Sequence, residues 1–197
     1  RDQGITRLYP GDKDKWYVKV PAFSFGKLRG MDAYLSPEMK STGEAIGYDV
    51  NLNRALYKAL KASGVRLSDH GTVVVTVADE DKGEVLPLVR RFYRLGYSIA
   101  ATVGTANFLK ENGLRVKVLG KLSEGSDEIL NTIRAGRVSY ILNTRAINSG
   151  VHYEDGVAIR RCAVENGVTM FTSLDTVQML LCSLEDLSFS ISTIDEA

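Results

Sequence analysis

The sequence is poor in the residues that stabilise or activate many small proteins. It contains only two cysteines, Cys162 and Cys182, among 197 residues, which is too few for a disulfide framework. Its two histidines, His70 and His152, are far apart and neither is near a cysteine, so no metal-ligand spacing is present. We therefore expect free thiols in a reducing, cytoplasmic setting, no metal site, and surface loop positions for both histidines.

Long apolar runs and an excess of one charge are also absent. No run of about 18 apolar residues could span a membrane, and the start of the chain has no signal-peptide pattern. Lys and Arg number 25 against 24 Asp and Glu, a net charge of +1, so no global field attracts nucleic acid or an anionic membrane. We expect neither as a partner, and any anion binding must come from a local cluster.

Residues 1–46 do not read as a complete unit. An apolar alternation at residues 17–20 predicts a short strand closed by Pro21, and residues 23–25 repeat the alternation. Two such strands are not stable without a larger sheet. We expect residues 1–46 to be the last edge of a preceding domain, and residues 47–70 to be a connecting helix and linker.

Helical and strand patterns alternate from residue 51 onward. The β-branched run at residues 72–77 predicts a strand buried on both faces. Asp81 and Glu84 have the spacing of a capping box that opens a helix ending at Leu95. Further strands are predicted at 97–101, 115–119, 138–143 and 168–171, and further helices at 105–112, 126–135, 154–166 and 174–184.

Five strands that alternate with five helices predict an α/β fold, a doubly wound five-stranded parallel sheet over residues 71–187. The remaining residues, 188–197, are polar and predict a loose tail. In such a sheet, ligands bind beyond the carboxyl ends of the strands. The strand ends are therefore the place to look for a site.

Cations, hydroxyls and helix starts lie after the predicted strands. Because free N–H groups at helix starts and basic side chains both favour anions, this rim predicts a phosphate site. A simpler interpretation is that the hydroxyls cap helices, the lysines are solvated and the asparagine forms a turn. The residues concerned are Lys82, Thr102, Gly104, Thr105, Lys121, Asn143 and Arg145.

Two groups of motifs resemble a known family. The runs V-K-V-P-A-F-S-F at 18–25, L-R-G at 28–30 and P-E-M-K-S-T-G-E at 37–44 resemble the end of the second ATP-grasp synthetase unit of the carbamoyl-phosphate synthase large subunit. The α/β part of the chain resembles that subunit's allosteric domain, which shares its fold with methylglyoxal synthase. The matching stretches are 77–82, 101–106, 121–125, 140–144 and 159–161.

This resemblance implies a regulatory region of a larger enzyme, feeding pyrimidine and arginine synthesis. The parent enzyme makes carbamoyl phosphate from bicarbonate, two ATP and ammonia, which a glutaminase small subunit supplies from glutamine. ATP and Mg²⁺, with K⁺ as a further candidate, belong to that parent. The present chain is then expected to hold no cofactor and to be inactive alone. Self-association through the allosteric domain is a further candidate interaction.

The resemblance also assigns an effector site. Family members that bind IMP or UMP hold its phosphate at positions matching Thr76, Lys82, Thr102, Thr105 and Lys121. Asn143 and Arg145 match contacts to the base and ribose, and Thr172 matches a residue that serves ornithine-responsive members. Arg145 stands where IMP-binding members carry Thr, and its N–H donors favour uracil, which offers two carbonyl oxygens.

Two alternatives stay open. One is a methylglyoxal-synthase-type lyase acting on dihydroxyacetone phosphate, which needs a general base supplied by a Gly-Gly-Asp motif. Here Ser126 takes the place of that Asp, and Asp127 and Glu128 are better read as carboxylates at a helix start that Ser126 caps. The other alternative is a structural docking domain with a vestigial site.

Overall fold

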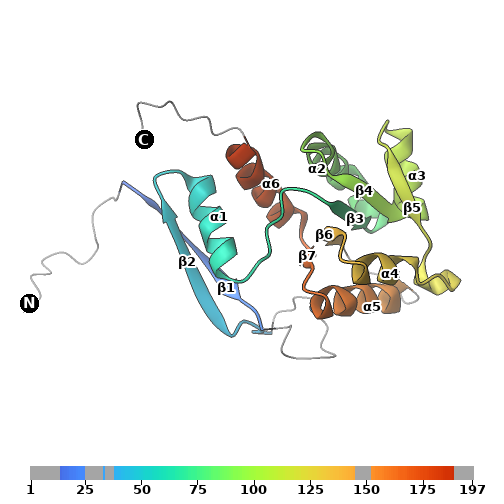
Figure 1. Cartoon of the computed structure of the whole chain (residues 1–197), viewed down its shortest axis with the longest axis horizontal. Coiled ribbons are helices and arrows are strands. Elements are labelled where there is room, and N and C mark those ends of the chain that lie inside the picture. Colours follow the sequence, from blue (N-terminus) through green and yellow to red (C-terminus); the bar gives the residue numbers. More distant parts are fainter. Residues whose placement is uncertain (1–13, 25–32, 34–37, 145–151, 189–197) are drawn as a thin grey trace, which may run out of the picture.

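A computed structural model of the chain describes residues 14–24, 33, 38–144 and 152–188 (Figure 1). Its centre is a parallel sheet with the strand order β5-β4-β3-β6-β7. The α/β fold and the five-stranded parallel sheet predicted from the sequence are confirmed. The strands are β3 (Thr72–Thr76), β4 (Ser98–Thr102), β5 (Val116–Leu119), β6 (Val138–Asn143) and β7 (Thr169–Phe171).

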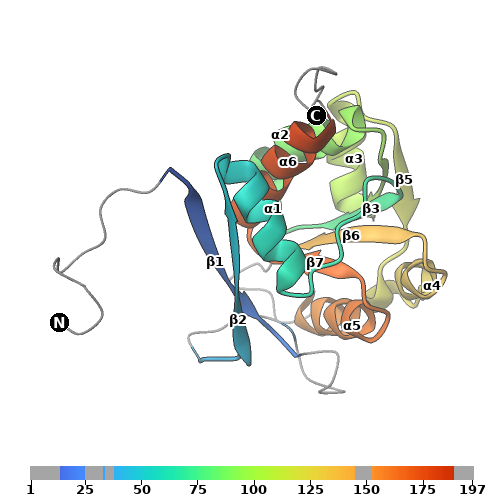
Figure 2. The same ribbon diagram turned by 60° about the vertical axis from the view of Figure 1, so that its left-hand side comes forward.

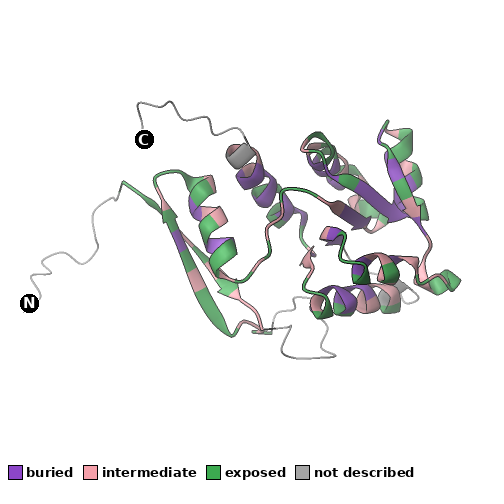
Figure 3. Ribbon diagram, in the orientation of Figure 1, coloured by how far each residue is buried: buried purple, intermediate pink, exposed green. Residues whose placement is uncertain are grey.

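Helices cover both faces of the sheet (Figure 2). On one face, α2, α3 and α6 pack on a core that includes Val73 and Val75. On the other face, α4 and α5 pack on a second core that includes Val74. The central strand is therefore buried on both sides, as predicted, and buried residues line the sheet in Figure 3. The helices are α1 (Leu52–Ala62), α2 (Lys82–Arg94), α3 (Val103–Glu111), α4 (Glu128–Arg134), α5 (His152–Glu165) and α6 (Leu174–Ser188).

A two-stranded antiparallel sheet precedes this domain, made of β1 (Trp16–Ala22) and β2 (Gly43–Asp49). Pro21 lies within β1 and does not close it, because a strand in a two-stranded sheet has a free edge where a missing N–H costs little. The second predicted strand is also wrong. Phe23 and Ser24 lie beyond β1, residue 25 lies outside the described residues, and the partner of β1 is β2.

Strand β2 lies directly against helix α1. A Cβ atom on Gly47 would collide with the backbone of Ala55 and Ala59, two helix residues that are fully buried. Small residues on both elements thus allow this close approach. The expected division after residue 46 falls within β2, and the assignment of residues 1–46 to a preceding domain stays a prediction.

Several helix ends differ from the sequence prediction. Asp81 forms no capping bond, because the short 3₁₀ helix η2 (Asp79–Asp81) runs directly into α2 and gives Asp81 helical backbone angles. His152, predicted to lie in a loop, begins α5. Helix α6 extends to Ser188, while residues 189–197 lie outside the described residues. Both cysteines are free, as predicted, and no described helix is long and apolar enough to cross a membrane.

Candidate anion-binding site

A row of polar side chains ends the three central strands. Thr76 of β3 is paired in register with Asn143 of β6, and Thr102 ends β4 on the other side of β3. In each strand the preceding residue faces the core on the side of α2, α3 and α6. Because successive side chains point to opposite faces, all three polar residues face the side of α4 and α5. The predicted carboxyl-edge location thus brings these residues together.

The start of helix α3 supplies free N–H groups beside this row. Thr102 is the N-cap residue with an extended backbone, but its side chain makes no capping hydrogen bond. Thr102 and Thr105 are only 9% and 2% exposed, and within the described part of the chain neither hydroxyl has a hydrogen-bond partner. Buried polar groups without a protein partner are uncommon. The simpler interpretation, in which these hydroxyls cap the helix, does not explain them.

Lys82 connects the first turns of two helices. It is the first residue of α2, and its side chain is only 19% exposed. A Cβ atom placed on Gly104, in the first turn of α3, would lie 3.6 Å from Lys82 Nζ. The ammonium therefore lies next to the positive end of α3, where an anion can contact both. In the present structure its ion-pair partner is Asp79, at 2.7 Å from Nζ to Oδ1.

Lys121 lies after β5 and begins a tight loop. Its carbonyl oxygen accepts the N–H groups of Glu124 and Ser126, so the 3₁₀ helix η3 (Leu122–Glu124) folds back on it. The loop is further held by Glu128, whose carboxylate accepts the N–H of Gly120 at 3.1 Å. No carboxylate among the described residues lies within ion-pair distance of Lys121, which leaves its charge available to a ligand.

Asn143 is held by a buried arginine that the sequence analysis did not select. Arg160 of α5 is 2% exposed, Asn143 is 4% exposed, and Arg160 Nη1 donates to Asn143 Oδ1 at 2.8 Å. Gly156 makes room for this pair, since a Cβ there would lie 2.9 Å from Arg160 Nη1. Ile159 and Cys162, on the same helix, are both buried in the core, but the charged side chain of Arg160 itself gave no local sign of burial.

Of the two remaining predicted site residues, the structure describes Thr172 but not Arg145. Thr172 lies after β7 at the same edge of the sheet and is half-buried. Arg145 lies outside the described residues. Neighbouring Thr144 accepts the N–H of Ala78 through Oγ1 at 3.0 Å, which ties the end of β6 to the loop that leads to Lys82.

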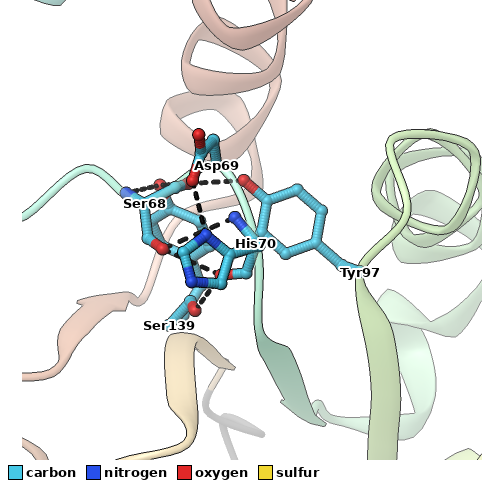
Figure 4. A network of polar contacts seen from close by, with 6 residues as sticks. Ser68, Asp69, His70, Tyr97 and Ser139 are labelled. Atoms are coloured by element: carbon cyan, nitrogen blue, oxygen red, sulfur yellow. Dashed lines mark hydrogen bonds and ion pairs between the residues drawn. The ribbon is translucent and has the colours of Figure 1, made fainter.

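A pocket of about 480 Å³ lies at the opposite edge of the sheet. It is lined by Tyr57, Leu67, Ser68, Asp69, Leu95, Tyr97 and Leu184. Figure 4 shows the polar network beside it, in which the Tyr97 hydroxyl donates to the Ser68 carbonyl. The Tyr140 hydroxyl also donates to that carbonyl, at 2.7 Å, and accepts the Ser68 N–H at 2.8 Å. Burial raises the pKa of both tyrosines. These groups satisfy one another and fix the segment before β3.

A family model and a solved structure of methylglyoxal synthase agree with this architecture. Residues 84–172 match the family model of the MGS-like domain. A crystal structure of methylglyoxal synthase from Elizabethkingia anophelis NUHP1 is similar, with 19% identity and a TM-score of 0.51 over 58% of this chain and 79% of that one. A crystal structure of ForH has 21% identity and a TM-score of 0.46 over 59% and 80% of the two chains. The matched residues include the α3 start, Lys121 and Asn143, while Lys82 lies just before them.

Proposed function

We propose that this chain is the regulatory carboxy-terminal region of a carbamoyl-phosphate synthase large subunit, and that its MGS-like domain binds a nucleoside monophosphate. The observation that supports this most strongly is the position of Lys82 Nζ beside the first turn of α3, next to two buried threonine hydroxyls that lack partners among the described residues. An N–H-rich helix start, hydroxyls and an ammonium are the usual ligands of a phosphate group. The P-E-M-K-S-T-G-E run at 37–44 supports the parent enzyme.

In this proposal the phosphate occupies the edge formed by β3, β4 and β5. Its oxygens accept hydrogen bonds from the hydroxyls of Thr76, Thr102 and Thr105. The ammonium groups of Lys82 and Lys121 supply positive charge. Asn143 and Arg145 contact the base or ribose. Thr172, beyond β7, is the candidate contact for ornithine. Binding then controls the ATP-dependent synthesis of carbamoyl phosphate elsewhere in the parent enzyme, which works with its glutaminase small subunit.

The fold is equally compatible with a methylglyoxal synthase, but the loop after β5 supports that reaction less well. Proton abstraction needs a carboxylate free to reach the substrate. Ser126 replaces the expected acid, and its side chain packs against Gly120. Asp127 is exposed, and Glu128 accepts a backbone N–H and lies 3.5 Å from Lys117 Nζ. Ser126 therefore cannot act as the carboxylate base, Glu128 is already engaged, and Asp127 lies exposed to solvent.

Calorimetric titration with UMP, IMP, ornithine and dihydroxyacetone phosphate separates the candidates. We expect a nucleotide to bind, UMP at least as tightly as IMP, and no methylglyoxal to form from the triose phosphate. Turnover of the triose phosphate would favour the lyase. Absence of binding by all four compounds would favour a docking domain with a vestigial site and would refute this proposal.

A further inference from the structure

The buried pair Arg160–Asn143 has a fixed polarity. A guanidinium carries only N–H donors, so the side of the Asn143 amide that faces it must be the oxygen. The bond of 2.8 Å from Arg160 Nη1 to Asn143 Oδ1 has this arrangement. The amide nitrogen therefore points away from Arg160. An amide rotation that exchanged the two atoms would set N–H groups against N–H groups in a buried position.

The amide nitrogen of Asn143 has no hydrogen-bond acceptor among the described residues. Within the part of the chain that the structure describes, Asn143 Nδ2 has no hydrogen-bond partner, although the residue is only 4% exposed. A buried donor without an acceptor is destabilising, so such a group is seldom left unused. Its strand position, in register with Thr76 and separated from Thr102 by β3, places it in the row of polar residues at the carboxyl edge.

We propose that Arg160 is a positioning residue that locks Asn143 as a hydrogen-bond donor, so that the site selects ligands with a keto oxygen and rejects those with an amino group at the same position. This inference rests on the proposed function, because it assumes a nucleoside monophosphate whose phosphate lies near Lys82. It adds the chemical class of the base. Uracil and hypoxanthine fit this polarity, whereas cytosine and adenine present an amino group where the Asn143 donor needs an acceptor.

Four other polar side chains of the proposed site are compatible with an acceptor-rich ligand. Thr76 and Thr102 have hydroxyls that can donate, and Lys82 and Lys121 have no acceptor at all. Among these five residues, Asn143 is the one whose donor is fixed by a neighbouring side chain and not by its own chemistry. A donor opposed to an amino group leaves two N–H groups facing each other without water, which binding sites discriminate against strongly.

The test is the ratio of UMP to CMP affinity, measured by calorimetry on the 197-residue chain and its variants. The two nucleotides differ at C4 of the base, keto against amino, and at the neighbouring N3, which carries a hydrogen in uracil and none in cytosine. We expect the unaltered chain to prefer UMP by about tenfold or more, as one hydrogen bond of about 1.4 kcal/mol predicts. Arg160→Gln, whose amide can donate or accept, frees Asn143 to rotate and should bring the ratio close to one. Arg160→Lys keeps a donor-only partner and should preserve the preference.

Two further variants serve as a control and as an independent test. Arg161→Gln makes the same change at an exposed neighbour on α5 and should leave the ratio unchanged. Asn143→Asp, which presents only acceptors, should shift the ratio toward CMP even if Arg160→Gln does not fold. An equal fall in both affinities on Arg160→Gln would mean that Arg160 acts through packing alone and would overturn the inference. Equal binding of UMP and CMP by the unaltered chain would overturn it as well, while leaving the proposed function standing. If that chain bound no nucleotide at all, both proposals would fail.

Discussion

The ammonium of Lys82 lies 2.7 Å from the carboxylate of Asp79, which is three residues earlier in the chain and almost fully in solvent. The 3₁₀ helix between β3 and α2 makes this pairing possible, because it turns the chain within three residues. Asp79 thus holds the position that an anionic ligand of Lys82 would take. The same local structure that prevents the predicted capping box therefore also supplies Lys82 with an internal counter-ion.

Replacing Asp79 by Asn should strengthen nucleotide binding. A ligand phosphate must displace the Asp79 carboxylate, and an exposed ion pair of this kind is worth up to about 1 kcal/mol. We therefore expect UMP affinity to rise by roughly two- to fivefold, and the gain to shrink at high salt. Calorimetry at low and high ionic strength measures it. A weaker affinity in the variant would show that Asp79 helps to build the site.

Removing either lysine should have the opposite effect. Lys82→Ala or Lys121→Ala should each weaken UMP binding by about 1.5–3 kcal/mol, the usual contribution of a charge-assisted contact. Urea unfolding should change little for both, because partly exposed charges contribute little to stability. Lys110→Ala, at the far end of α3, is the matched control. If affinity survived both site substitutions, the nucleotide would bind elsewhere.

Much of this edge could be predicted because it depends on local patterns. The β-branched run of β3 and the helix pattern after each strand define the sheet, and the carboxyl-edge rule then places Lys82, Thr102 and Asn143 together. Thr102 illustrates the limit of that reasoning. Its sequence context fits an N-cap equally well, and only the structure shows that its hydroxyl makes no capping bond.

Other features depend on contacts between residues far apart in the chain. Arg160 reaches Asn143 across 17 positions, and an arginine in a helix gives no local sign that it is buried. Strand β2 was missed for a similar reason. Its segment contains two glycines, which weaken a strand pattern, and Gly47 is explained only by the backbone of α1 lying against it. Such tertiary requirements override local propensity.

Gly104→Ala tests the close approach of Lys82 to helix α3. The new methyl group would lie 3.6 Å from Lys82 Nζ, where a phosphate oxygen would otherwise approach, so UMP affinity should fall about tenfold. Gly83→Ala is a matched control in the first turn of α2, where an added Cβ meets no atom within 4 Å. Both should gain stability of roughly 0.5–1 kcal/mol from helix propensity. A similar loss of affinity in both variants would contradict the proposed phosphate site between Lys82 and the start of α3.

The tyrosine network at the amino edge should affect stability and leave binding unchanged. Tyr140→Phe removes the acceptor of the Ser68 N–H and should cost about 1–3 kcal/mol, whereas Tyr97→Phe leaves the Ser68 carbonyl bonded to Tyr140 and should cost about 1 kcal/mol. Burial raises both pKa values above the ordinary value of 10.0, so the unfolded chain loses these protons first. Their contribution to stability is therefore fully present below pH 10 and is lost as the pH rises further. Urea midpoints should accordingly fall as the pH rises above about 10, and less steeply in the double Phe variant. An identical fall in that variant would show that other groups determine the alkaline transition.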